Sequence, residues 1–247
     1  MAFLADTAAT DASFGRHSAQ RRREPRPIDT DWLVLKGLTA AVEATVPRIA
    51  RPGGVALDFG CGSRPYATLF QDAGMTYVGA DFSGGDVTID AAGHIGAPDA
   101  SCDLVLSFQV LEHVRDLTTY FAEARRVLRP GGRLLLSTHG SWLYHPHPED
   151  HRRWTREGLV AEMADHGFVT SDCVPVVGPL AWTTILRLTG AAYALRKIPV
   201  VGGAIAGALA VVMNARAVVE DAVTPAWITR ENACVYVTLS APAEPRG

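Results

Sequence analysis

Short apolar segments alternate with glycine turns and amphipathic stretches along most of the chain. The segments predicted to be strands are 55–57, 77–81, 86–90, Cys102–Phe108, 133–138, 169–177 and 231–241. The segment Cys102–Phe108 is apolar nearly throughout, which is typical of a strand buried on both faces of a parallel sheet. Strands that alternate with helices predict an open α/β sheet.

Helices are predicted between these strands from apolar residues at helical spacing and from residues that favour N-cap positions. The first begins at Asp29 or Thr30 and has one apolar face, made of Trp32, Leu35, Leu38, Val42 and Val46. Another is capped by Asp116, and a third begins at Thr155 and ends at Gly167.

The segment VALDFGCGSRPY (55–66) combines a short strand, an acid, a glycine turn and the start of a helix. Gly60 and Gly62 allow a sharp turn and let a ligand approach the backbone closely. The helix that follows directs its first N–H groups at that ligand. About twenty residues later Asp81 ends the second strand, at a spacing that suits a carboxylate bonded to ribose hydroxyls. The pattern indicates a site for a nucleotide-like cofactor.

The strings LDFGCG, GAD, FQVLEHV and RVLRPGGRLLLS occur in that order between residues 55 and 137. In sequence and spacing they resemble the class I S-adenosylmethionine-dependent methyltransferases, and in particular the methyltransferase type 11 branch. The resemblance implies a Rossmann-like, doubly wound, seven-stranded sheet whose last strand runs antiparallel, here with a helical insert before the final strand. The string HPHPEDHRRWTREGL resembles a subgroup often found in glycan and cell-surface biosynthesis.

The resemblance also implies which residues bind S-adenosyl-L-methionine. Around the methionine end and the ribose these are Asp58, Gly60, Gly62 and Asp81; around the adenine they are Phe82, Asp90 and Ala91; and Gln109 faces the centre of the cofactor. Three features depart from the family pattern. Arg64 and Pro65 stand where a third glycine is common, 94–100 replaces a Leu-Pro-Phe string, and Gln109 stands where some metal-using relatives have glutamate.

Histidines gather in the segment that follows the fifth strand, because half of the chain's eight histidines lie between residues 138 and 155. Histidine suits a general base near neutral pH. His145 and His147, each beside a proline, are therefore candidate catalytic bases, and His113 directly after the fourth strand is a third. Arg153 and Trp154 are expected to brace this loop. An alternative is a hard divalent cation such as Mg²⁺ on Glu112, His113 and a loop histidine, although the neutral amide of Gln109 weakens that site.

Composition narrows the class of protein. The formal net charge of −3 and the lack of a broad basic patch exclude a nucleic-acid-binding function. The basic run 21–27 is assigned to a disordered arm, 1–27. Four scattered cysteines without metal spacing indicate reduced core thiols and a cytoplasmic protein. The expected organisation is the arm, a cofactor-binding core over 28–178, an insert over 179–230, and a final strand with its tail over 231–247.

The insert contains a charge-free stretch, 198–215, at the lower limit of a membrane span. Proline, glycine and alanine make its apolarity modest, so a helical lid over the substrate pocket or a homodimer surface is favoured. Peripheral membrane or lipid contact through 198–215 stays open.

The favoured function is O-methylation of a hydroxyl on a small-molecule acceptor such as a sugar or polyol. N- or C-methylation of a small or lipid-linked acceptor is the alternative within the enzymes. A non-catalytic cofactor-binding or membrane-associated scaffold is a second class. A dehydrogenase is less favoured, because GCG followed by Ser-Arg-Pro is a poor dinucleotide fingerprint.

Overall fold

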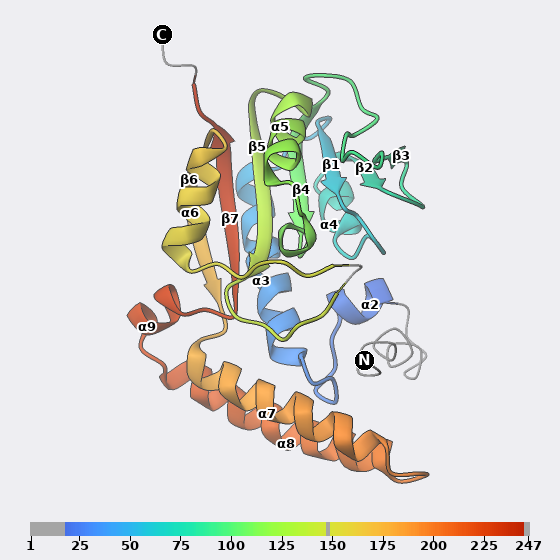
Figure 1. Ribbon diagram of the computed structural model, residues 1–247, viewed down its shortest axis with the longest axis vertical. Coiled ribbons are helices and arrows are strands. Elements are labelled where there is room, and N and C mark those ends of the chain that lie inside the picture. Colours follow the sequence, from blue (N-terminus) through green and yellow to red (C-terminus); the bar gives the residue numbers. More distant parts are fainter. Residues whose placement is uncertain (1–17, 147–148, 245–247) are drawn as a thin grey trace.

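A computed structural model describes residues 18–146 and 149–244 of the chain. Its centre is a single seven-stranded sheet with the order β3-β2-β1-β4-β5-β7-β6 (Figure 1). In chain order the strands are β1 (Val55–Phe59), β2 (Thr76–Asp81), β3 (Val87–Thr88), β4 (Cys102–Phe108), β5 (Leu128–His139), β6 (Phe168–Val176) and β7 (Val235–Pro242). The first five pair in parallel, and β7 runs antiparallel to both β5 and β6. The predicted fold class is confirmed.

Helices cover both faces of the sheet. Their bounds are α2 (Ser18–Arg23), α3 (Trp32–Ile49), α4 (Ala67–Asp72), η1 (Leu111–His113), α5 (Leu117–Val127), α6 (Arg156–Asp165), α7 (Pro179–Arg196), α8 (Gly202–Val223) and α9 (Ala226–Glu231). Neighbouring strand residues point to opposite faces: Leu135 packs in the core beneath α3 and α4, whereas Leu134 and Leu136 pack beneath α5 and α6. Alternation along the strands thus fills two cores with one sheet.

N-cap residues recognised in the sequence correctly mark the starts of two helices. The Asp116 carboxylate accepts from the N–H of Thr119 and caps α5, and the Thr155 hydroxyl accepts from the N–H of Gly158 and caps α6. The start of α3 differs from the prediction. Asp31 is its N-cap, because the buried Asp29 instead accepts from the N–H of Arg26 at 2.6 Å. The third strand is also shorter than predicted.

The end of the N-terminal arm is helical, which corrects the expected disorder over 18–27. Helix α2 is held by an ion pair between Arg21 Nη2 and Asp31 Oδ1 at 2.6 Å. The carbonyl of Arg22 accepts from the Thr39 hydroxyl, and the Arg23 guanidinium donates to Thr68. The basic run finds its partners on α3 and α4, and these tertiary contacts order it.

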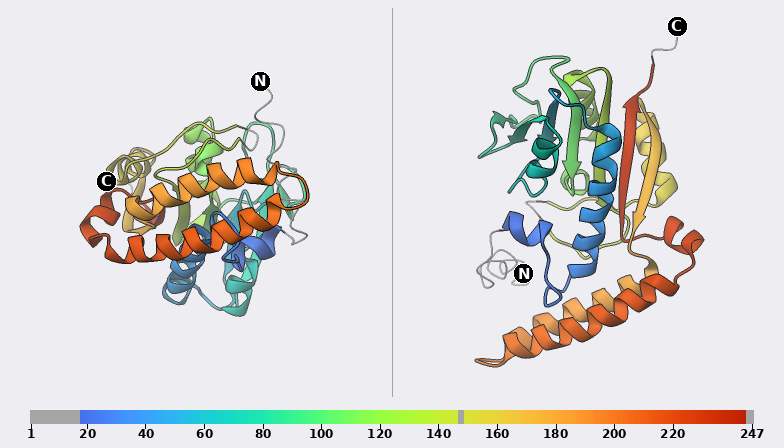
Figure 2. Two further views of the ribbon diagram at one scale, coloured as in Figure 1. Left: turned by 90° about the horizontal axis from the view of Figure 1, so that it is seen from below. Right: turned by 180° about the vertical axis from the view of Figure 1, so that it is seen from behind.

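Helices α7 and α8 form a long antiparallel hairpin beyond the carboxyl ends of β1 and β4 (Figures 1 and 2). The predicted insert is therefore helical, and the charge-free stretch supplies the turn and most of α8. Within the described ranges, one helix is long enough and apolar enough to cross a membrane, judged by length and composition alone. This helix is α8, Gly202–Val223.

Candidate functional site

A cavity of about 860 Å³ opens at the carboxyl end of the parallel strands. Its wall includes residues at or just after four strand tips, namely Gly60, Asp81, Gln109 and His139, and residues of α2, α3 and the loop after β5. This is the edge at which open α/β sheets bind ligands. Trp182 of α7 stacks on the cavity residue Trp142 with ring centroids 4.9 Å apart, but no described residue of 179–230 lines the cavity itself.

The glycine turn after β1 requires its glycines. Gly60 has φ 81° and Gly62 has φ 48°, both in the left-handed region. A Cβ on Gly60 would lie 2.7 Å from Cγ2 of Val110. The N–H groups of Gly60 and Cys61 donate to the carbonyl of Ala80 at 2.9 and 3.1 Å. The turn is thereby locked to the tip of β2.

Arg64 shows how the turn closes without a third glycine. It adopts φ 55°, a conformation that costs a non-glycine residue about 1–2 kcal/mol. Its Nη1 donates to both carboxylate oxygens of Asp86 at 2.9 Å, and its Nη2 donates to the carbonyl of Gly84. These bonds compensate for the strained backbone.

Asp81 lies at the centre of this cradle. Its two carboxylate oxygens accept from the N–H of Gly62 and from the N–H of Phe82, each at 2.7 Å. Its side chain lines the cavity, and the exposed ring of Phe82 lies on the same wall. The position suits a carboxylate that accepts from neighbouring ligand hydroxyls.

Of the other residues assigned to the cofactor, some line the cavity and some do not. Gln109 and Ala91 line the cavity, and Gln109 has φ 59° with its Nε2 donating to Ser137 Oγ at 3.1 Å. Asp90 does not line it, because its carboxylate turns to the N–H groups of Ala92 and His94. Asp58 lies behind the wall. Its carboxylate accepts from the Tyr77 hydroxyl at 2.5 Å, and burial raises the pKa of Asp58 to about 6.

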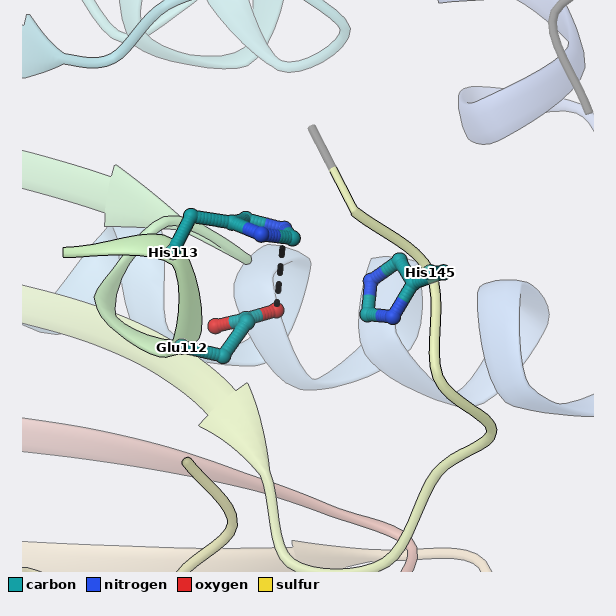
Figure 3. Close-up of side chains that lie close together, drawn as sticks. All are labelled: Glu112, His113 and His145. Carbon is teal, nitrogen blue, oxygen red and sulfur yellow. Dashed lines mark ion pairs between the residues drawn. The ribbon is translucent and has the colours of Figure 1, made fainter. Parts of the chain in front are cut away.

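Three histidines surround the buried carboxylate of Glu112, and Figure 3 shows two of them. Glu112 Oε1 lies 3.3 Å from His139 Nε2 and 4.0 Å from His113 Nε2. The His145 ring lies with its centroid 4.9 Å from that of His113 and 5.1 Å from that of His139. Glu112 Oε2 accepts from the Thr138 hydroxyl, whereas Oε1 has no aligned hydrogen-bond donor among the described residues.

Burial favours the neutral form of these imidazoles. Desolvation lowers the pKa of His113, lowers that of His139 strongly, and lowers that of His145 to about 4. The same desolvation raises the pKa of Glu112 to about 7. The cluster therefore offers neutral nitrogen bases beside a carboxyl group that ionises near neutral pH.

Neighbouring carbonyls assign the tautomers of two imidazoles. His113 Nδ1 lies 2.6 Å from the carbonyl of Glu149, and His145 Nδ1 lies 3.1 Å from that of Leu143. A carbonyl can only accept, so Nδ1 carries the proton in both rings. Their Nε2 atoms then carry the lone pair that can accept a proton.

The loop that brings His145 to the cavity is braced as predicted. The Arg153 guanidinium donates to both oxygens of Asp150 at 2.6 and 2.7 Å and to the carbonyl of Leu143 at 2.8 Å. Burial opposes ionisation of Asp150, but the bonds from Arg153 and from the N–H of His145 hold the pKa of Asp150 below its usual range. Trp154 is buried against the second core.

Two site residues escaped the sequence-based prediction, and one predicted residue lies outside the described ranges. His139 was not selected, although its place at the tip of β5 matches that of Gln109 at the tip of β4. Arg22 was assigned to a disordered arm, and only Asp29 and Asp31 downstream hinted at partners for that basic run. His147 belongs to the two residues between the described ranges, so its role stays a prediction.

The residues at Glu112 do not fit Mg²⁺. Ligand atoms of Glu112, His113 and His145 all lie within 4.8 Å of one another. Only one of the three is an oxygen ligand, whereas Mg²⁺ prefers oxygen ligands and imidazole suits transition metals.

The sequence profile of the family described as "Methyltransferase domain" matches residues 34–190 of the chain. A "probable S-adenosylmethionine-dependent methyltransferase" of Mycolicibacterium smegmatis is 33% identical over 102 residues, which are 36% of this chain and 40% of that protein. The malonyl-[acyl-carrier protein] O-methyltransferase of Serratia marcescens is 32% identical over 101 residues, again 36% and 40%. The chain thus covers less than half the length of these relatives.

Solved structures share the fold at low identity. Phosphoethanolamine N-methyltransferase 2 of Haemonchus contortus, in complex with S-adenosyl-L-methionine, superposes with a TM-score of 0.53 at 15% identity over 93% of this chain and 61% of that chain. The 1,6-didemethyltoxoflavin-N1-methyltransferase of Burkholderia thailandensis gives a TM-score of 0.50 at 15% identity over 97% and 84%.

Proposed function

The chain belongs to the S-adenosylmethionine-dependent methyltransferases, and from this premise we propose that it methylates a hydroxyl group of a small polar acceptor such as a sugar or polyol. The observation that carries the proposal is the group of neutral histidines around Glu112 in the cavity wall. A hydroxyl is a poor nucleophile until its proton is removed, so it gains more from a positioned base than an amine does. The resemblance of the string HPHPEDHRRWTREGL to a subgroup often found in glycan and cell-surface biosynthesis supports a sugar-like acceptor. Four unpaired cysteines, three of them buried, support a cytoplasmic reaction.

We assign Asp81 to the ribose hydroxyls of the methyl donor, S-adenosylmethionine. Gly60 and Gly62 would let this donor approach the backbone of the turn closely. When bound, S-adenosylmethionine supplies a methyl group on a positively charged sulfur. Asp81 would accept from the two ribose hydroxyls while keeping its bonds to the turn, because each carboxylate oxygen has more than one lone pair. The family's donor would then lie across the strand tips, with Gln109 near its middle.

Arg22 is our candidate for the carboxylate of the donor's methionine part. It is half-buried in the cavity wall, and no described residue accepts a hydrogen bond from its guanidinium. Its positive charge acts on both Asp58 and Glu112, and Asp58 belongs to the part of the cradle that we assign to the methionine end. An arginine binds a carboxylate through two parallel hydrogen bonds.

Arg22→Gln is expected to weaken S-adenosylhomocysteine binding roughly 10- to 100-fold, the effect of losing a hydrogen bond between charged groups. Binding of 5′-methylthioadenosine, which lacks the amino-acid carboxylate, should stay unchanged. Calorimetric titration with both ligands measures the difference. Arg23→Gln is the matched control, because that guanidinium donates to Thr68 instead. Equal losses for both ligands would contradict the assignment.

His113 is our candidate for the general base. Its Nε2 would accept the acceptor's hydroxyl proton as the oxygen–methyl bond forms and the methyl–sulfur bond breaks, with the electron pair left on sulfur. The ionised Glu112 carboxylate, 4.0 Å away, would stabilise the imidazolium that results. His145 packs edge-on against the ring.

The pH dependence follows from Glu112. Burial lowers the pKa of His113 below its ordinary value, so Glu112 is the first of the two groups to gain a proton as the pH falls. Glu112 has a pKa raised to about 7 and loses its charge below that value. We expect kcat to fall about tenfold per pH unit below pH 7, and Glu112→Gln to abolish this limb while lowering the plateau. A wild-type kcat that holds to pH 5.5, with donor binding intact, would contradict the role of Glu112.

The proposed function is tested by supplying the protein with S-adenosylmethionine and matched acceptors that carry either a hydroxyl or an amine on the same sugar scaffold. We expect S-adenosylhomocysteine and a methyl ether to form with hydroxyl acceptors at a rate that depends on His113. Methylation confined to the amine acceptors would favour N-methylation instead. No step is assigned to a metal ion, since the cluster does not fit Mg²⁺.

A further inference from the structure

The outward side of α8 is apolar over its whole length. Every exposed residue of this helix except Arg216 is glycine, alanine, valine or isoleucine. A helix that lies on a protein and faces water normally carries charged and polar residues on its outer side. Twelve of the seventeen exposed large hydrophobic side chains in the described ranges lie between residues 180 and 227. The apolar surface is therefore concentrated on α7–α9 instead of being scattered.

The inner side of α8 already has its partners. Ala206 and Ala210 pack with Leu188 and Ala192 of α7. Asn214 Nδ2 donates to the carbonyls of Pro27 and Asp29, both at 2.8 Å. Seen from below, α7 and α8 lie side by side in front of the rest of the molecule (Figure 2). The outward face of the pair is thus turned away from the sheet.

Charge distinguishes this segment from the rest of the chain. Residues 179–231, which include α7, α8 and α9, carry five basic side chains (Arg187, Arg196, Lys197, Arg216 and Arg230) and three acidic ones (Glu220, Asp221 and Glu231), a net charge of +2. The whole chain has a net charge of −3, so the remaining residues carry −5. Helices α7–α9 thus form a basic, apolar layer on an otherwise acidic protein. Such a layer complements a negatively charged apolar surface.

Both ends of the layer carry groups suited to a lipid interface. At the turn between α7 and α8, Val200 has φ 66° and is 102% exposed, next to Lys197 and Ile198. A valine is unfavourable there for two reasons: a β-branched residue rarely adopts the left-handed conformation, and its apolar side chain is fully exposed to water. At the other end Trp227 of α9 is 70% exposed, and tryptophan favours the boundary between lipid and water.

We propose that the α7–α8 hairpin binds the surface of an anionic lipid bilayer, with its outward face in the interface and its basic residues among the headgroups. The helices would lie in the plane of the membrane, as amphipathic anchors do. A span by α8 would strip Asn214 from its two hydrogen bonds and separate α8 from α7. The carboxyl ends of the parallel strands, where the cavity opens, lie at the same end of the sheet as the hairpin (Figure 1). Docking would therefore bring the cavity close to the lipid surface.

The test is sedimentation of the full chain with vesicles of phosphatidylcholine alone or with 30% phosphatidylglycerol. We expect binding to the mixed vesicles, and at least about tenfold weaker partition for the double variant Val212→Glu/Val219→Glu. Both valines are exposed on α8, by 66% and 61%. Val169→Glu is the matched control, since that valine is 61% exposed on β6 and away from the hairpin. S-adenosylhomocysteine binding reports that each variant is folded.

Further measurements distinguish lipid binding from dimer formation by the same face. Tryptophan fluorescence should shift to shorter wavelength on vesicle binding, and Trp227→Phe should remove this shift. A high-salt wash should release the protein. Failure to bind either kind of vesicle, or equal binding by the double variant, would overturn the proposal. So would a dimer in light scattering that the double variant dissociates, because the face would then join two copies of the chain. The outcome is independent of the acceptor and of the His113 role.

Discussion

Asp81→Ala is expected to lower affinity for S-adenosylhomocysteine by about 100-fold or more. Two ribose hydroxyls would lose a charged acceptor, and each such hydrogen bond contributes about 1.5–3 kcal/mol. The N–H groups of Gly62 and Phe82, now bonded to Asp81 at 2.7 Å, would lose their partner as well. Calorimetric titration with S-adenosylhomocysteine measures the loss.

Asp90→Ala is the informative control for Asp81. Both carboxylates follow strands on the same side of the sheet, but Asp90 is turned to the N–H groups of Ala92 and His94. We expect its replacement to change binding much less than Asp81→Ala does. Unchanged affinity in the Asp81 variant would refute the ribose assignment, and a large loss in the Asp90 variant would restore the adenine role inferred from the family.

His113→Ala is expected to lower kcat by about 10²–10⁴-fold, the usual contribution of a general base. S-adenosylhomocysteine affinity should stay unchanged, because we assign the ring to the acceptor and not to the donor. His145→Ala should cost less. The double variant should be little worse than His113→Ala alone if the two rings act as one unit. Single-turnover rates with a hydroxyl acceptor measure the effect.

His94→Ala serves as the control for the base, since that ring is exposed and bonded to Asp90 outside the cavity wall. His147→Ala tests the remaining histidine predicted from sequence. Full activity in both the His113 and His145 variants would show that neither ring is the base. A loss of activity in which KM changes and kcat does not would point to acceptor binding by these rings.

Much of the fold could be predicted, because strand and cap signals are local. The buried strand Cys102–Phe108 and the caps Asp116 and Thr155 need only their neighbours in sequence to be recognised. The two-residue β3 and the start of α3 were less predictable. Asp29 looks like an N-cap in sequence, but the N–H of Arg26 takes its carboxylate in the folded chain.

Site residues could be predicted from the sequence only where they stand at the end of a recognisable strand. Asp81 and Gln109 stand at the ends of apolar runs, so the sheet carries them to one edge. Arg22 and Glu112 are different, because their role depends on which distant groups pack near them. Nothing within the run around Arg22 signals that Asp31 will anchor the helix beside the cavity. Likewise, the pKa of Glu112 depends on burial that only the tertiary structure creates.

Asn214 joins the hairpin to the segment next to α2, and α2 contributes to the wall of the cavity. Its two hydrogen bonds reach the carbonyls of Pro27 and Asp29, in the connector between α2 and α3, and α2 carries Arg22. A displacement of α8 would therefore be transmitted to the Arg22 guanidinium, which we assign to the donor's carboxylate. Thermodynamic reciprocity then applies: if binding at the outer face changes donor affinity by some factor, the bound donor changes the affinity of the outer face for its partner by the same factor.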